Sequence, residues 1–234
     1  MAHLSRQPLS WQEMDADQLF GSCPPDSSLC RYRMEMDLRK AALTKWPSLP
    51  PGFQCSNWKW SDCEDFATVL YRSFVDSPDA QIIPSFRTWE GCQELARVVA
   101  QNGYFWPSAT LLIRDRNDPV GCIQVMGCPD GKVNIQNIGI VPNYRRLRLG
   151  NYLLARALST VQKWGLGMVG LEVTADNAAA LALYQRFGFV RLSEVWKPVV
   201  PLPRETREAR ENTHTISIPA YPESPAGGSD GSTR

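Results

Sequence analysis

Three arginines, Arg145, Arg146 and Arg148, fall directly after an apolar run typical of a strand and directly before a helical pattern. A helix N-terminus favours phosphate because its first N–H groups are unpaired and carry partial positive charge. Gly150 has no side chain, so the backbone can approach a bulky ligand. Guanidinium groups add charge-assisted hydrogen bonds to phosphate oxygens. Residues 138–150 therefore predict a site for a phosphate-bearing cofactor, although a short basic run is also typical of a solvated surface.

A second segment that could take part in chemistry covers residues 171–189. Asn177 has the side chain of a helix N-cap, and Gly188 stands where a helix would end in the left-handed conformation. Between them, the phenol of Tyr184, with an ordinary pKa of about 10, could return a proton to a departing thiolate at neutral pH. A tyrosine at this spacing is also typical of a packed core or groove.

Together the two segments resemble the GNAT superfamily of N-acyltransferases. The second fits that family's pattern N-x-x-A-x-x-L-Y-x-x-x-G-F without departure, at Asn177, Ala180, Leu183, Tyr184, Gly188 and Phe189. The first fits the cofactor motif, a strand followed by V-x-P-x-x-[R/Q]-x-x-G-x-[G/A], at Arg145 and Gly150. It departs where Val141 and Pro142 are adjacent and where Arg148 replaces the first glycine. A positive φ at Arg148 would be strained, so this position tests whether the loop keeps its path.

The hydrophobic pattern predicts the same kind of fold as the resemblance. Strands are predicted at residues 32–38, 53–58, 109–115, 120–126, 133–141, 170–174 and 189–196. Helices are predicted at 62–74, 89–101, 149–164 and 178–187, with a loop at 75–86. We expect an α/β fold of the α+β type, in which an antiparallel N-terminal meander precedes a β-α-β-α-β unit and helices cover both faces of a mixed sheet.

Composition divides the chain into three parts. Residues 1–30 lack a sustained period and predict a flexible N-terminal arm, and residues 31–198 form the predicted acyltransferase domain. Residues 199–234 are charged, then rich in Pro, Gly and Ser, which predicts disorder. Alternatively, the charged stretch 204–211 and the N-terminal arm would serve as docking segments for a partner.

The resemblance implies acetyl-CoA as co-substrate, lying in an opening between two splayed parallel strands near residues 133–141 and 170–174. Backbone N–H groups near Ile138 and Ile140 would polarise the thioester carbonyl. The implied cofactor-binding residues are Ile138, Gly139, Ile140, Arg145, Arg146, Leu147, Arg148, Leu149, Gly150, Asn151, Asn177 and Ala180. An amine would attack directly, and Tyr184 would act as the general acid.

The general base is less evident, because residues 133–141 contain no acid. Asn137, with Asn134 and Gln136, could order a water that relays the proton toward Glu172 or an acid of the loop at 76–79; these amides would equally suit hydrogen bonding within the sheet. Asn137 is our second candidate catalytic residue. Cys122 and Cys128 are disfavoured as acyl carriers because neither histidine of the chain, at 3 or 214, is nearby in the sequence.

The helices at 62–74 and 89–101 and the loop between them should form the acceptor side. The candidate acceptor contacts are Asp76, Asp79, Gln81, Phe86 and Trp89. Acidic residues suit a cationic amine, whether a small molecule or a peptide, but they are also common in solvated loops. The alternative function is an acyl-CoA-binding sensor, or a degenerate domain with little turnover.

Composition excludes several other classes. A formal net charge of +1 argues against a nucleic-acid partner. The seven cysteines form no C-x-x-C pair, and with only two histidines no metal site is expected. The sequence has no run of 18 apolar residues and no leader-like N-terminus, so we expect a cytoplasmic protein with reduced thiols and no membrane partner. The choice between a monomer and a homodimer is left open.

Overall fold

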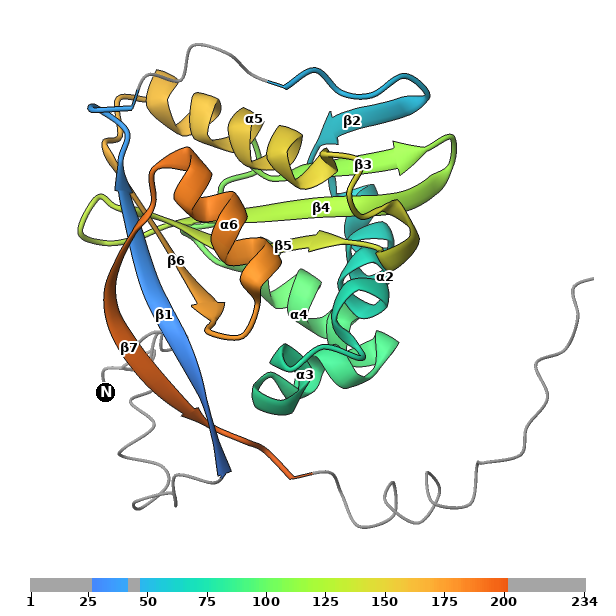
Figure 1. Cartoon of the computed structure of the whole chain (residues 1–234). Helices are drawn as coiled ribbons and strands as arrows, with labels where there is room; N and C mark the ends of the chain where they lie inside the picture. The colour runs from blue at the N-terminus through green and yellow to red at the C-terminus, as the bar shows by residue number, and fades with distance from the viewer. Residues whose placement is uncertain (1–26, 42–46, 202–234) are drawn as a thin grey trace, which may run out of the picture. The chain divides into compact units, whose positions relative to one another are not determined.

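The structure is a computed structural model that describes residues 27–41 and 47–201. Its centre is a mixed sheet (Figure 1). The strands are β1 (Ser28–Asp37), β2 (Phe53–Asn57), β3 (Leu111–Asp115), β4 (Asp118–Gly127), β5 (Val133–Ile140), β6 (Met168–Thr174) and β7 (Val190–Pro198). They lie side by side in the order β2-β3-β4-β5-β6-β1-β7.

One parallel pair interrupts an otherwise antiparallel sheet. Strands β2 to β5 are antiparallel neighbours, as the predicted meander requires, and β5 is parallel to β6. The first strand does not join the meander: β1 lies between β6 and β7 and runs antiparallel to both. Its alternating Met34 and Met36 are buried in the core beside the late strands. Alternating apolar residues in the sequence indicate that such a strand has one face in the core, but they do not indicate which strands lie next to it.

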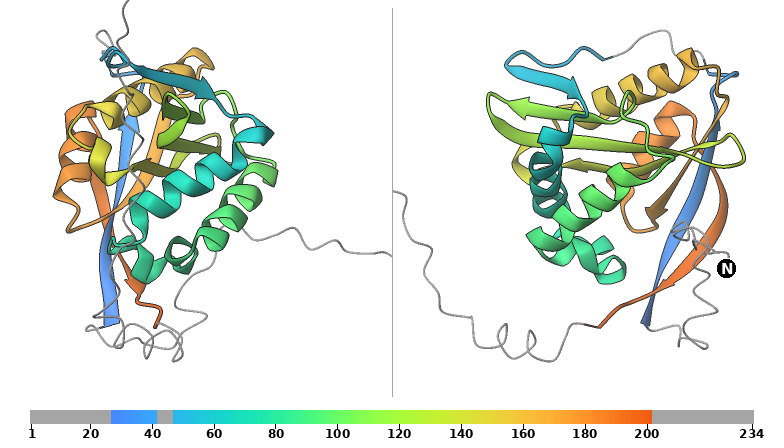
Figure 2. Two further views of the ribbon diagram at one scale, coloured as in Figure 1. Left: turned by 90° about the vertical axis from the view of Figure 1, so that its right-hand side faces the viewer. Right: turned by 180° about the vertical axis from the view of Figure 1, so that it is seen from behind.

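Helices cover both faces of the sheet, as expected (Figure 2). They are α2 (Cys63–Phe74), α3 (Asp79–Ile82), α4 (Trp89–Gln101), α5 (Leu149–Lys163) and α6 (Ala178–Phe187), with 3-10 turns η2 (Trp60–Asp62), η3 (Pro84–Arg87) and η4 (Pro142–Tyr144). One core packs α5 and α6 against the sheet, and the other packs α2 and α4. Alternate residues serve the two cores: Leu111 faces α5, and Leu112 faces α2.

The segment predicted as a loop at 75–86 contains α3 and part of η3. Two aromatic side chains explain why it is ordered: Phe86 is 1% exposed and its ring stacks on Phe74 with centroids 4.5 Å apart. The aromatic pair contributes about 1 kcal/mol beyond the apolar area that it buries. The polar and proline residues of this segment are typical of a loop, so the sequence did not indicate that Phe74 and Phe86 would stack.

The folded part of the chain extends a few residues beyond both predicted domain boundaries, into the predicted arm and into the predicted tail. β1 already begins at Ser28, because Ser28 pairs with Pro198 at the far end of β7. Beyond β7, Val199 donates its N–H to Ser27 O at 2.7 Å and Val200 donates to Gln81 O at 2.8 Å. The rest of the predicted arm and tail, residues 1–26 and 202–234, lies outside the described residues.

Candidate acyl-CoA and acceptor site

A cleft opens where β5 and β6 diverge. The two strands pair only at Val133–Val169, Asn134–Gly170 and Ile135–Leu171. The next residue of β5, Gln136, is the extra residue of a β-bulge, because Gln124 pairs with Asn137 and Val125 with Ile135. Bulges bend a strand and redirect its backbone groups. The predicted opening between the two parallel strands is therefore present.

The register of β5 determines which backbone groups face the opening. Val141 donates its N–H to Val120 O on the β4 side at 3.0 Å. Backbone groups of successive residues in a strand point to opposite neighbours. Hence the N–H groups of Ile138 and Ile140 point away from β4, toward the space that β6 has left. These are the two positions at which the sequence predicted a polarising role.

The cleft has a volume of about 1220 Å³ and is lined by β5, the loop before α5, the starts of α5 and α6, and the segment after α2. Sixteen of the predicted site residues line it: Asp76, Asp79, Phe86, Asn137, Ile138, Gly139, Ile140, Arg145, Arg146, Arg148, Leu149, Gly150, Asn151, Asn177, Ala180 and Tyr184. Three of the predicted residues do not line the cleft: Leu147 turns a 44% exposed side chain to solvent, and the predicted acceptor contacts Gln81 and Trp89 lie outside the lining. The Trp89 indole instead donates to Thr68 Oγ1 at 3.3 Å.

The loop before α5 keeps left-handed backbone conformations in spite of its arginines. Arg146 has φ +64°, and Arg148, at the N-cap of α5, has φ +62° and ψ +14°. This conformation costs a non-glycine residue roughly 1–2 kcal/mol. Arg148 makes no side-chain cap, so the first N–H groups of α5 stay available at the cleft. Arg148 therefore adopts a backbone conformation that glycine adopts without this cost.

The three arginines have different partners. Arg145 donates from Nε to Ile140 O at 3.2 Å and from Nη2 to Ser73 O at 3.1 Å. It thus ties the loop to β5 and α2, a role that the expected phosphate contact did not include. The side chains of Arg146 and Arg148 make no hydrogen bond or ion pair within the described part of the chain. Of the three, Arg146 and Arg148 therefore have guanidinium groups that are available to bind an anion.

Two glycines of the motif segments differ in their surroundings. A Cβ at Gly150 would meet Leu183 Cδ2 at 3.6 Å, which is ordinary contact, so the space there belongs to the open cleft. A Cβ at Gly139 would meet Ser73 Oγ at 3.0 Å and Phe74 Cε2 at 3.3 Å. Gly139 therefore allows α2 to pack closely on β5, whereas Gly150 leaves room for a ligand.

The start and end of α6 follow the sequence prediction. Asn177 Oδ1 accepts a hydrogen bond from Ala180 N at 3.1 Å, and Gly188 ends the helix with φ +96°. Tyr184 is 4% exposed, lines the cleft and packs edge-on against Phe189. Burial, and less strongly the charge of Asp79, raises the pKa of the Tyr184 phenol above its usual value, while Arg31 acts in the opposite direction. The phenol therefore stays protonated at neutral pH.

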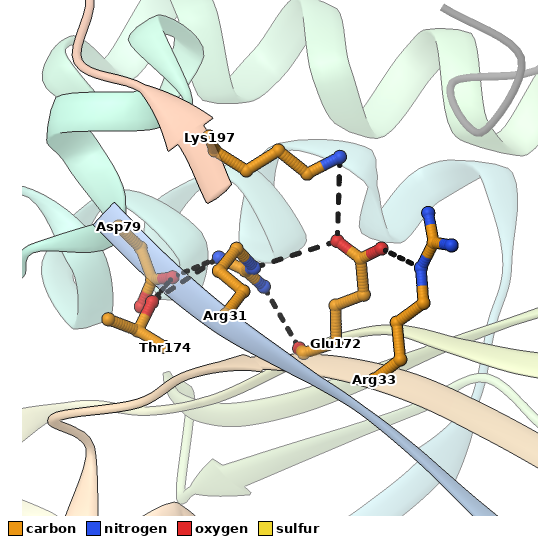
Figure 3. Close-up of polar contacts among 6 residues, drawn as sticks. All are labelled: Arg31, Arg33, Asp79, Glu172, Thr174 and Lys197. Carbon is orange, nitrogen blue, oxygen red and sulfur yellow. Dashed lines mark hydrogen bonds and ion pairs between the residues drawn. The ribbon is translucent and has the colours of Figure 1, made fainter. Parts of the chain in front are cut away.

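The polar groups proposed as a proton relay are largely engaged by the protein. Asn137 donates from Nδ2 to Oε1 of the fully buried Gln124 at 2.8 Å. Glu172 accepts from Arg33 Nε at 3.0 Å, and its other oxygen lies 3.7 Å from both Arg31 Nε and Lys197 Nζ (Figure 3). Cationic side chains of β1 and β7 therefore pair with both carboxylate oxygens of Glu172, which lies on β6.

The two acidic candidates for acceptor contacts are not equivalent. Asp79 is 8% exposed, forms an ion pair with Arg31 Nη1 at 2.5 Å and accepts from Thr174 Oγ1 at 2.8 Å (Figure 3). Asp76 lines the cleft with an exposed side chain, and no described residue pairs with it. Of these two candidates, only Asp76 therefore has a carboxylate without a partner among the described residues.

Sequence reasoning did not identify Arg31, which lines the cleft with a side chain only 11% exposed. It alternates with the core residues of β1, a position that usually faces solvent. Only the placement of β1 beside β6 brings it to Asp79 and Thr174. No signal in the sequence links residues so far apart.

Other chemistries find little support among the described residues. Cys122 is fully buried, and burial raises the pKa of its thiol to about 12, which argues against a thiolate acyl carrier. No group of His, Cys, Asp or Glu within residues 27–41 and 47–201 is arranged to hold a metal ion. In the same part of the chain, no helix has the length and apolar character needed to cross a bilayer.

Comparison with solved structures first defines the class of fold. The structure of a GCN5-related N-acetyltransferase from Sphaerobacter thermophilus superimposes with a TM-score of 0.57, covering 75% of this chain and 54% of that one at 19% identity. The model of the Acetyltransferase (GNAT) family matches residues 63–189, and the chain belongs to this family. The resemblance inferred from the two motif segments is confirmed.

Two curated relatives show the range within the family. A mycothiol acetyltransferase of Clavibacter michiganensis subsp. michiganensis is 31% identical over 161 residues, which cover 69% of this chain and 50% of the relative. The [ribosomal protein bS18]-alanine N-acetyltransferase of Escherichia coli strain K12 is 45% identical over 53 residues, or 23% of this chain and 36% of the relative. The chain thus spans half the length of the first relative.

Proposed function

We propose that this protein transfers an acetyl group from acetyl-CoA to a primary amine by direct attack on the thioester. The observation that carries the proposal is one cleft that contains both the N–H groups of Ile138 and Ile140, beyond the stretch of β5 that pairs with β6, and the uncapped start of α5. The residues fit a pyrophosphate-bearing group: the first turn of α5 offers N–H donors, Gly150 leaves space, and the side chains of Arg146 and Arg148 have no partner among residues 27–41 and 47–201.

Each part of the cleft then has a task. The N–H groups of Ile138 and Ile140 hold the pantetheine arm and stabilise the developing oxyanion of the thioester carbonyl. As the amine nitrogen forms a bond to the carbonyl carbon, the carbon–sulfur bond breaks, and Tyr184 donates its phenolic proton to the leaving sulfur. The proton lost by the amine passes to water ordered by Asn137, or to the exposed carboxylate of Asp76.

The acceptor is proposed to be a cationic amine, either a small molecule or a peptide, because Asp76 is exposed and unpaired at the acceptor side. The Asp76→Asn variant should raise the KM of the amine by about 2- to 10-fold at low salt, with a smaller effect at high salt, because exposed charges are screened. Asp79→Asn should instead reduce stability, because it removes the shorter of the two ion pairs of the Arg31 side chain.

The decisive experiment incubates the full chain with acetyl-CoA and a panel of amines while free thiol is monitored. We expect thiol release with at least one amine, above the level of a Tyr184→Phe control. No thiol release above background on any amine would overturn the proposed transfer, and equal release by both proteins would overturn the role of Tyr184 as the acid. Adding amines in a thermal-shift screen with CoA present would narrow the acceptor, since a bound acceptor stabilises the folded state.

A second candidate function is an acyl-CoA sensor with little turnover. It is favoured by the engagement of Glu172 with three cations and by the lack of an acid on β5. This function predicts tight acetyl-CoA binding by calorimetry without thiol release. The same thiol assay therefore separates the two candidates.

A further inference from the structure

The acceptor side of the cleft has a wall made of two very short elements. We define this acceptor wall as residues 78–87, which contain α3 and η3. The wall lines the cleft through Pro78, Asp79, Ile83 and Phe86. Helical segments of four residues do not hold their shape alone, because nucleation is costly and few hydrogen bonds form. The position of the wall must therefore come from contacts with other parts of the chain.

One set of contacts holds the wall from inside the domain. Asp79 is bound by Arg31 of β1 and by Thr174 of β6, and Phe86 stacks on Phe74 of α2. These contacts fix the two ends of the wall, at the start of α3 and at η3. They leave the middle of the wall, at Ala80 and Gln81, to be held otherwise.

A second set of contacts comes from the residues that follow β7. Val200 donates its N–H to Gln81 O at 2.8 Å, and its own carbonyl accepts from Arg87 Nη2. The same guanidinium donates from Nε to Ala80 O at 2.7 Å and from Nη2 to Gln81 O at 3.0 Å. Arg87 and Val200 are separated by 113 residues in the sequence. Together they close a ring of hydrogen bonds around the middle of the wall.

We propose that residues 199–200 form a strap that positions the acceptor wall, so that Val200 and Arg87 are positioning residues for the amine acceptor. This inference rests on the proposed function. The described hydrogen bonds of the strap go to the acceptor wall and to Ser27, and none goes to residues 138–151. The strap therefore does not hold the cofactor side of the cleft. Loosening the strap should therefore weaken acceptor binding and spare acetyl-CoA binding.

The strap is tested by hydrogen–deuterium exchange of the full chain, which does not depend on turnover. Val200→Pro removes the N–H that binds Gln81 O. Val199→Pro is the matched control, because it removes the N–H that binds Ser27 O and leaves the wall contacts in place. We expect peptides covering residues 78–87 to exchange about tenfold faster in Val200→Pro only, as loss of a hydrogen bond would cause. Equal exchange of the wall in wild type and Val200→Pro would overturn the proposal.

Kinetics then test whether the wall matters for the acceptor. With acetyl-CoA and the best amine of the panel, Val200→Pro should raise the KM of the amine about 5- to 10-fold, with kcat and the Kd for acetyl-CoA unchanged. Arg87→Lys keeps the charge but loses the planar fork, and should shift the same KM in the same direction. An unchanged KM in both variants, or an equal loss of acetyl-CoA affinity, would overturn the positioning role. If no amine supports turnover, the proposed function fails, while the exchange experiment still decides the strap.

Discussion

Two helices begin at the same cleft, and their first turns are built in opposite ways. At α6, the Asn177 side chain accepts from Ala180 N and so satisfies the helix's own donor. At α5, the N-cap is Arg148 in a left-handed conformation, without any side-chain cap. A helix start that satisfies its own N–H groups has less to offer a ligand. The difference supports our proposal that α5 binds the cofactor while α6 positions Tyr184.

The largest expected effect tests whether α6 supplies the catalytic acid. Tyr184→Phe should lower kcat at least about 100-fold, because it removes the proton donor, and should leave the Kd for acetyl-CoA within about twofold. Since burial raises the pKa of Tyr184 above its usual value near 10, wild type should not lose this acid on raising the pH to about 10. Steady-state kinetics from pH 6 to 10 provide the measurement. A variant with undiminished kcat would mean that α6 only supports the cleft.

Gly150→Ala tests the binding half. The added methyl occupies the space over the first turn of α5 and should weaken acetyl-CoA binding by roughly 10- to 100-fold, measured by calorimetry. The fold should tolerate it, because a Cβ there makes only ordinary contacts, and a helical alanine adds about 0.5–1 kcal/mol of stability. Gly103→Ala is the matched control, since no atom lies within 4 Å of its Cβ position. Unchanged affinity in Gly150→Ala would remove the α5 N-terminus from the site.

Asn177→Ala should show the opposite pattern. Loss of the cap should lower the free energy of unfolding by about 1 kcal/mol, measured by urea denaturation, and should change the Kd for acetyl-CoA less than about twofold. If affinity falls as much as in Gly150→Ala, Asn177 is a cofactor ligand, as the sequence first suggested, and the contrast between the two helix starts disappears.

The smallest effect concerns the strain at Arg148. Arg148→Gly should raise the free energy of unfolding by up to about 1 kcal/mol, because glycine adopts the left-handed conformation without a Cβ clash. Arg116→Gly is the matched control, since Arg116 has φ +54° in the turn between β3 and β4 and does not line the cleft. Both variants should gain stability, but only Arg148→Gly should weaken acetyl-CoA binding and reduce its salt dependence. Equal affinities would show that the Arg148 charge plays no part.

Much of the candidate site could be predicted because it lies in two continuous segments. In residues 133–151 and 171–189, local patterns fix strand, turn, cap and helix in order, and the structure places all but one of the predicted residues there on the cleft. The acceptor side was harder. Asp76 and Asp79 look alike in sequence, but one is exposed and the other is paired with Arg31. Burial and pairing depend on elements far away in the chain.

The sequence by itself determined most of the element types, the two motif segments and the family, because periodicity, capping residues and turn residues act over a few neighbouring positions. Only the tertiary structure decided that β1 enters between β6 and β7, that cations surround Glu172, and that residues 199–200 bind the acceptor wall. The physical reason is the same in each case. Apart from the pair of Lys197 and Glu172, these contacts join groups more than a hundred residues apart, and their free energy exists only once the sheet has assembled.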